Sequence, residues 1–155
     1  MDNRCTVHPP GGGTGYDWSS DFTVVKVSSG DTGGHYTLME DNLKQGFRLG
    51  LHMHRHHAET FYILEGPTDF HLDGVWVSAE PGTTIHVPPG VPHACRLPEG
   101  NRGKMLMIYQ PSGFDQYLAE LATFTDEDFQ DAARMAALDE KYDIIQLGPV
   151  PEGPA

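Results

Sequence analysis

Short runs of strand-forming residues, each followed by a turn residue, recur along most of this chain. β-Branched and aromatic side chains are frequent in these runs, and 18 glycines and 12 prolines are available for turns. Such residues favour strands and tight turns respectively. The runs read DFTVVKV, HYTLME and FRLGLHMH, then ETFYILEG, TDFHLDG, VWVSAEPG, TTIHVPPG and KMLMIYQ. Because no long helical pattern interrupts the series, the sequence predicts an all-β fold, an antiparallel sandwich or barrel.

The chain changes character at both ends. Residues 1–20, which include PPGGGTG, have no periodicity, and we expect a flexible N-terminal arm there. Residues 21–112 hold the strand-like runs and form the predicted barrel. Residues 113–155 show apolar residues at helical spacing before a Pro/Gly tail, so we expect one or two C-terminal helices followed by a tail.

Two stretches carry the helical signal. SGFDQYLAELATF has apolar residues every three or four positions. TDEDFQDAARMAALDEKY begins with Thr125 as the expected N-cap and Asp128 at the third helical position, a variant of the capping box. We expect the buried stripe of this second helix to consist of Phe129, Ala132, Ala133 and Ala136.

Charge and composition exclude several classes of partner. The chain has 10 basic and 22 acidic residues, a net charge of −12. A surface this acidic repels nucleic acid backbones and anionic membranes. No apolar run approaches the roughly 20 residues of a membrane span, and the first residues do not resemble a signal peptide. We therefore expect a cytoplasmic protein whose two cysteines, Cys5 and Cys95, are reduced.

The stretch LHMHRHHAETFYILEG contains four of the nine histidines within six residues. If the first part is a strand, His52 and His54 project from the same face. Glu59 follows after a short turn, and its carboxylate can meet both imidazoles from a neighbouring strand. Imidazole and carboxylate together suit divalent Fe, Mn, Ni, Cu, Co or Zn. His93, after the turn in VPPGVPHAC, offers a fourth ligand.

The spacing of these residues resembles the two metal-binding motifs of the cupin superfamily. The first motif reads Gly46, five residues, His52, Met53, His54, four residues, Glu59, six residues and Gly66. The second reads Gly82, five residues, Pro88, Pro89, Gly90, two residues and His93. The asparagine that often follows the last histidine is replaced by Leu97. The resemblance implies a double-stranded β-helix, or jelly-roll barrel, in which His52, His54, Glu59 and His93 bind one divalent transition metal.

A longer similarity narrows the group. YTLMEDNLKQGFRLGLHMHRHHAETFYILEG, PPGVPHA, the Pro–Ser–Gly–Phe helix start and KYDIIQLGP resemble small bacterial cupins of the quercetin dioxygenase-like group. This implies a metal-dependent dioxygenase that uses O2 on an aromatic or enolisable oxygenated small molecule, with Glu59 as both ligand and proton acceptor. Two alternatives stay open: a non-redox lyase, isomerase or cyclase with the metal as Lewis acid, and a small-ligand-binding cupin. Cupins commonly form homodimers, and we expect one here.

Four other polar residues near the motifs have undetermined roles. His56 and His57 fall in the turn outside the motif spacing, so we expect them to be solvated or to support the site indirectly. His86 precedes His93 on a strand-like run and could line the cavity. Arg48 shares strand parity with His52 and can either reach a substrate oxygen at the barrel mouth or form a surface ion pair.

Overall fold

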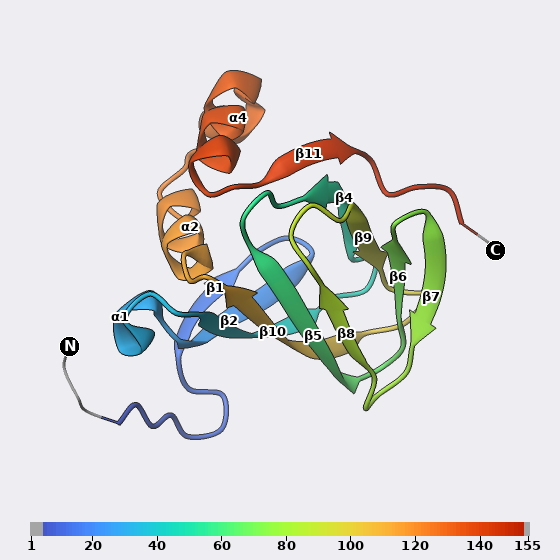
Figure 1. Ribbon diagram of the computed structural model, residues 1–155, viewed down its shortest axis with the longest axis horizontal. Coiled ribbons are helices and arrows are strands. Elements are labelled where there is room, and N and C mark those ends of the chain that lie inside the picture. The colour runs from blue at the N-terminus through green and yellow to red at the C-terminus, as the bar shows by residue number, and fades with distance from the viewer. Residues whose placement is uncertain (1–4, 154–155) are drawn as a thin grey trace.

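Two antiparallel sheets face each other in the computed structural model, which describes residues 5–153 (Figure 1). The six-stranded sheet has the order β1 (Thr14–Asp17), β2 (Asp21–Val27), β3 (Thr37–Leu43), β10 (Gly103–Gln110), β5 (Ala58–Glu65) and β8 (Thr84–Val87). The five-stranded sheet has the order β11 (Ile145–Gly148), β4 (Arg48–Met53), β9 (His93–Arg96), β6 (Thr68–Leu72) and β7 (Val75–Ala79). From β3 to β10 the chain passes repeatedly from one sheet to the other. The predicted jelly-roll barrel is therefore confirmed.

Strand alternation places the core between the sheets. Along β3, residues Thr37, Met39, Asp41 and Leu43 are buried while the residues between them are half-buried. Phe61 from β5 and Phe70 from β6 meet in the middle, with ring centroids 5.1 Å apart. Thr37, Met39 and Leu43 are uncharged and pack at these inward positions, whereas Asp41 places a carboxyl there.

The structure contains short elements that the sequence pattern did not predict. Strand β1 lies within the segment expected to be an arm and pairs with β2. Strands β9 and β11 have four residues each, and the one-turn helix α1 spans Ser29–Thr32. Elements this short have too few residues to show a period. They are held by their neighbours: β9 lies between β4 and β6.

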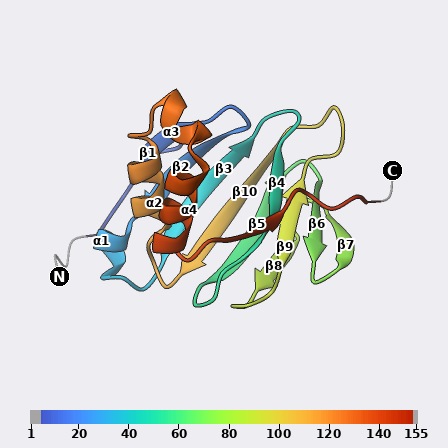
Figure 2. The same cartoon turned by 90° about the horizontal axis from the view of Figure 1, so that it is seen from above.

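The C-terminal helices gather at the end of the barrel that also carries β1 and β2 (Figure 2). They are α2 (Phe114–Leu121), α3 (Asp126–Gln130) and α4 (Ala132–Lys141). The second predicted helix is thus divided in two at Asp131, whose extended backbone caps α4 through its carboxylate. After α4, strand β11 runs along β4 in the five-stranded sheet.

One prediction for the second helical stretch is confirmed and one is wrong. The capping box is present, with Thr125 and Asp128 exchanging side-chain and backbone hydrogen bonds. The expected buried stripe, however, is exposed at Phe129, Ala132, Ala133 and Ala136. The break at Asp131 changes the helix phase, so α4 instead buries Leu138 and Asp139.

Two predictions from composition can be compared with the described residues. Cys5 is exposed and Cys95 is buried, and both are free thiols. Within residues 5–153 no helix has the length and apolar character needed to cross a membrane.

Two motif glycines with positive φ make different steric demands. Gly66, between β5 and β6, has φ 67°, and a Cβ there would overlap the carbonyl oxygen of Arg102. Gly46, before β4, has φ 85°, but a Cβ there would meet no atom within 4 Å. Both positions therefore disfavour a side chain, and only Gly66 also lacks the space.

We expect Gly66→Ala to lower the free energy of unfolding by roughly 3 kcal/mol, because backbone strain and overlap add. Gly46→Ala is the matched control and should cost roughly 1 kcal/mol through strain alone. Urea denaturation of both variants measures the difference. Equal losses would contradict the close approach of Arg102.

Candidate metal centre

Four predicted residues converge between the two sheets. His52 lies near the end of β4, His54 just beyond it, and His93 begins β9, where it pairs directly opposite His52. Glu59 projects from β5 in the other sheet. One ligand atom from each residue lies within 4.8 Å of all the others, and all four residues are buried. This cluster could hold a metal ion.

The position of Glu59 differs from the one expected. The sequence suggested that Glu59 meets the histidines from a neighbouring strand, but β4 pairs with β9 and β11, whereas β5 pairs with β10 and β8. The turn after His54 carries the chain to the opposite sheet. Glu59 therefore approaches the imidazoles across the barrel interior, which places the cluster inside the barrel.

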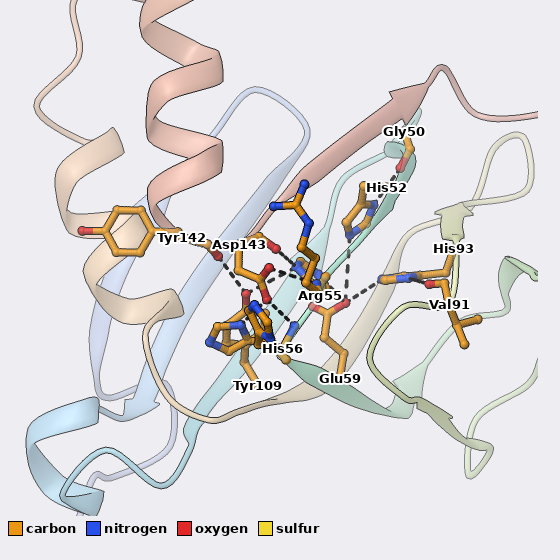
Figure 3. A network of polar contacts seen from close by, with 12 residues as sticks. Gly50, His52, Arg55, His56, Glu59, Val91, His93, Tyr109, Tyr142 and Asp143 are labelled. Atoms are coloured by element: carbon orange, nitrogen blue, oxygen red, sulfur yellow. Dashed lines mark hydrogen bonds and ion pairs between the residues drawn. The ribbon is translucent and has the colours of Figure 1, made fainter.

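One oxygen of Glu59 faces the Nε2 atoms of all three histidines, and Figure 3 shows His52 and His93 pointing toward it. Its Oε2 lies 2.6 Å from Nε2 of His93, 3.2 Å from Nε2 of His54 and 4.0 Å from Nε2 of His52. Nε2 is therefore the nitrogen that each histidine could offer to a metal, and it faces the centre of the cluster.

Backbone carbonyls determine which ring nitrogen carries the proton. A carbonyl only accepts hydrogen bonds, so an Nδ1 beside it must donate. The three contacts are His52 Nδ1 to Gly50 O at 2.9 Å, His54 Nδ1 to Asp143 O at 2.8 Å and His93 Nδ1 to Val91 O at 3.0 Å. In the neutral rings each Nε2 lone pair then points at a carboxylate, an arrangement that repels unless a cation lies between. The donor set therefore fits a divalent cation.

The ionisation of the cluster also fits this interpretation. Burial lowers the pKa of His52 to about 4, so this ring is neutral at pH 7, as a metal ligand must be. Burial opposes ionisation of Glu59. When no metal is bound, His54 and His93 can instead carry a second proton on Nε2 and donate it to Glu59, and these hydrogen bonds outweigh burial and hold the pKa of Glu59 well below its usual range. Burial likewise opposes protonation of His54, yet Glu59 raises its pKa overall. The carboxylate is thus ionised and attracts positive charge.

Asp143, in the turn before β11, holds the loop that carries His54. Its carboxylate accepts hydrogen bonds from the backbone N–H groups of Arg55 at 2.9 Å and His56 at 2.8 Å, and its Oδ2 lies 2.6 Å from His57 Nδ1 (Figure 3). Its own backbone is left-handed, with φ 60°. The sequence pattern did not single out Asp143, because it lies 89 residues from His54.

The uncertain polar residues now have positions. His56 is exposed, and His57 stacks on Tyr109 with ring centroids 4.4 Å apart, so both lie outside the cluster as expected. Arg48 lines the cavity described next. His86 is exposed, with Nδ1 2.9 Å from Thr60 Oγ1, and does not line it. The suggestion that His86 lines the cavity was therefore wrong: strand alternation turns it outward between buried neighbours.

A cavity of about 860 Å³ opens beside the cluster. His52, His54 and Glu59 form part of its wall, and both sheets together with α2 and α3 contribute the rest. Its aromatic lining residues are Trp18, Phe47, Phe61, Phe114, Tyr117 and Phe129. The exposed Phe129 thus belongs to the cavity wall rather than to the core. The cavity can take a flat, largely apolar molecule.

A second polar group in the cavity wall was missed by sequence reasoning. Asp41 is 6% exposed, and burial, followed by the neighbouring Asp21 carboxylate, raises the pKa of Asp41 to about 8. Thr23 Oγ1 lies 3.1 Å from Asp21 Oδ2 and 3.1 Å from Asp41 Oδ1. The available signal was a carboxyl at an inward strand position between Met39 and Leu43.

Comparisons with known proteins agree with this geometry. The cupin domain family matches residues 39–109. Quercetin 2,3-dioxygenase from Bacillus subtilis (strain 168) is 32% identical over 97 residues, which is 63% of this chain and 28% of that protein. The chain therefore spans just over a quarter of the length of this curated relative.

Solved structures show the same fold at low sequence identity. An RmlC-like cupin from Shewanella frigidimarina NCIMB 400 superposes with a TM-score of 0.62 at 19% identity, covering 75% of this chain and 99% of that one. The polyketide cyclase RemF from Streptomyces resistomycificus has a TM-score of 0.54 at 18% identity, covering 76% and 84%. At these identities the likeness concerns the fold alone.

We expect the purified protein to carry about one divalent transition-metal ion per chain. Because His52 and His93 each present Nε2 to the cluster, His52→Ala and His93→Ala should reduce metal content to near zero. His57→Ala is the control and should keep its metal, since His57 lies outside the cluster. Elemental analysis of the three variants tests this, and unchanged metal in His52→Ala would contradict the assignment.

We expect Asp41 to make stability fall as pH rises. Its folded pKa is raised, so between about pH 4 and pH 8 the folded state keeps a proton that the unfolded state loses, and the free energy of unfolding decreases across that window. Asp41→Asn should remove this slope and be more stable than wild type at pH 8 by on the order of 1–3 kcal/mol. Urea denaturation at pH 5 and pH 8 measures it.

Asp17→Asn is the matched control for this prediction, because the Asp17 side chain is 73% exposed. It should keep the wild-type slope. If the free energy of unfolding of Asp41→Asn changed with pH in the same way as that of the wild type, this would contradict a folded state in which Asp41 keeps a proton.

Proposed function

We propose that the chain is a metal-dependent dioxygenase of the quercetin dioxygenase-like group, acting on an aromatic or enolisable oxygenated small molecule; its match to the cupin domain family and its similarity to the Bacillus subtilis protein support this. The observation that carries the proposal is the cluster of three histidines and one glutamate in the wall of an aromatic-lined cavity. The name of the Bacillus subtilis relative supports the reaction class, although the chain spans only 28% of that protein.

His52, His54, Glu59 and His93 would hold one divalent transition metal: Fe, Mn, Ni, Cu, Co or Zn. Such an ion supplies a Lewis acid for a substrate oxygen and, if redox-active, a path for electrons to O2. The protein provides the donor atoms on opposite sheets, and the backbone carbonyls at Nδ1 keep the rings oriented. The three imidazole rings are therefore already oriented before a substrate binds.

Glu59 is the proposed proton acceptor. In its present contacts the hydrogen bonds from His54 and His93 make it a weak base, because they hold its pKa low. Burial acts in the opposite direction and raises the pKa of a carboxylate. A Glu59 side chain that loosens from those contacts would therefore become basic enough to take the proton of a substrate hydroxyl.

The cavity favours an aromatic substrate over a small polar one. Phe61 and Met107 form apolar wall near the cluster, and Tyr117 from α2 contributes at the helical side. Aromatic walls bind flat rings and exclude water, which would otherwise compete for the proton and for the metal position.

The expected result is O2 consumption when the metal-loaded protein meets quercetin or a related phenolic compound. Glu59→Gln should retain part of its metal but lower kcat by at least about 100-fold, because the proton acceptor is lost. Glu65→Gln is the matched control, an exposed glutamate on the same strand paired with Lys104 at 3.3 Å, and should keep full activity. An oxygen electrode measures the rate.

The same assay distinguishes the alternative reactions. Turnover that continues without O2 and with zinc in the site would replace the dioxygenase by a non-redox lyase, isomerase or cyclase. Binding without turnover under either condition would leave a small-ligand-binding cupin.

The homodimer, the cytoplasmic location and the division into an arm (1–20), a barrel (21–112) and a helical extension with tail (113–155) stay predictions. Sedimentation equilibrium would test the dimer.

A further inference from the structure

An inward-facing carboxyl stands in the cavity wall far from the metal ligands. Asp41 is only 6% exposed, and it occupies an inward position of β3 where burying an apolar residue would cost less free energy than burying a carboxyl. Its Oδ1 contacts Thr23, and its carboxyl also shares a hydrogen bond with Asp21. This buried carboxyl pair lies in the wall of the cavity, where a ligand can meet it.

The contacts of Thr23 imply that the carboxyl pair carries a proton. Its hydroxyl has one hydrogen and lies 3.1 Å from both Asp21 Oδ2 and Asp41 Oδ1. It can donate to only one of them at a time. The carboxyl that does not accept this hydrogen can form a hydrogen bond with Thr23 Oγ1 only if it is protonated and acts as the donor. Ser20 already donates to Asp21 Oδ1 at 2.7 Å, which favours Asp21 as the ionised member and Asp41 as the acid.

Strand register gives the distance between this pair and the candidate metal centre. Across the sheet, Thr37 pairs with Tyr109 and Tyr109 with Glu59, while Asp41 lies four residues further along β3. Two strand spacings and four residues separate the Cα atoms of Glu59 and Asp41 by about 16 Å. Side chains reach in from both ends, and the remaining gap is too long for a single phenol ring but suits two or three rings.

The surface between the two ends is apolar and adaptable. Strand β10 lies between β3 and β5, and its inward residues Met105 and Met107 line the cavity there. Methionine side chains are flexible and adjust to flat ligands. Polar groups at both ends with an apolar middle describe an elongated molecule that carries oxygen at each end.

We propose that Asp41, together with Asp21, is a specificity-determining site that binds a hydroxyl group at the end of a multi-ring substrate remote from the metal ligands. This inference rests on the proposed function for the orientation of the substrate, but not on turnover. The pair both accepts and donates hydrogen bonds, as a phenolic hydroxyl requires. It selects against compounds whose remote ring has no such group, because an apolar ring would desolvate the carboxyl oxygens without offering a new hydrogen bond.

The test compares two ligands that differ in the remote hydroxyls. Quercetin has hydroxyls on its outer rings, and 3-hydroxyflavone keeps only the one beside the ketone. Binding is measured without O2, so that no oxidation occurs, through quenching of Trp18, which lines the cavity. A Trp76→Phe background removes the other of the two tryptophans.

Asp41→Leu, which removes the donor and acceptor at similar volume, should weaken quercetin binding about tenfold and leave 3-hydroxyflavone within about twofold. Asp21→Asn should act in the same direction and serves if Asp41→Leu does not fold. Asp73→Asn is the control: Asp73 is exposed in the turn between β6 and β7, outside the cavity wall, and its replacement should change neither affinity.

Equal weakening of both ligands would mean that Asp41 only supports the wall, and this would overturn the proposal. An unchanged quercetin affinity in both carboxyl variants, or no binding of either ligand to the wild type, would overturn it as well. If the carboxyl variants lost affinity for quercetin alone and the wild type consumed no O2, this inference would stand while the proposed dioxygenase activity failed.

Discussion

A buried carboxylate facing three imidazole nitrogens is the interaction on which the rest of the site depends. Glu59 Oε2 lies within 4.0 Å of the Nε2 atoms of His52, His54 and His93, and backbone carbonyls occupy every Nδ1. Four buried polar side chains cost free energy unless something compensates for their desolvation. A divalent cation at the centre would do so, and the barrel therefore holds the ligands where a metal makes the arrangement favourable.

The C-terminal extension belongs to the site rather than merely covering the barrel. The carboxylate of Asp143 accepts hydrogen bonds from the backbone of the loop after His54, and its carbonyl accepts one from the His54 ring. Helices α2 and α3 supply Tyr117 and Phe129 to the cavity wall. The exposure of Phe129 follows from this arrangement, because α3 contributes this side chain to the cavity wall instead of packing it into a core.

The cavity combines two kinds of polar end with an apolar middle. With a metal bound, the candidate metal centre would offer positive charge to a substrate oxygen, whereas the Asp21–Asp41 pair is proposed to form hydrogen bonds with a hydroxyl. Met105 and Met107 lie between them. The apolar middle would bind the rings of a substrate, and the two polar ends would orient it. Together they would decide which substrate atom lies next to Glu59.

The sequence by itself indicated most of the strands and the candidate ligands, because both leave local traces. Eight of the strands appear as separate runs of strand-forming residues, and the spacing from Gly46 to Gly66 separates His52 and His54 from His56 and His57. Only the tertiary structure placed Glu59 on the opposite sheet, turned His86 outward, brought Asp143 to His54 and set Asp41 beside Asp21. Those relations depend on which strands pair and on how helices close the barrel, and contacts between distant segments leave no period or spacing in the sequence.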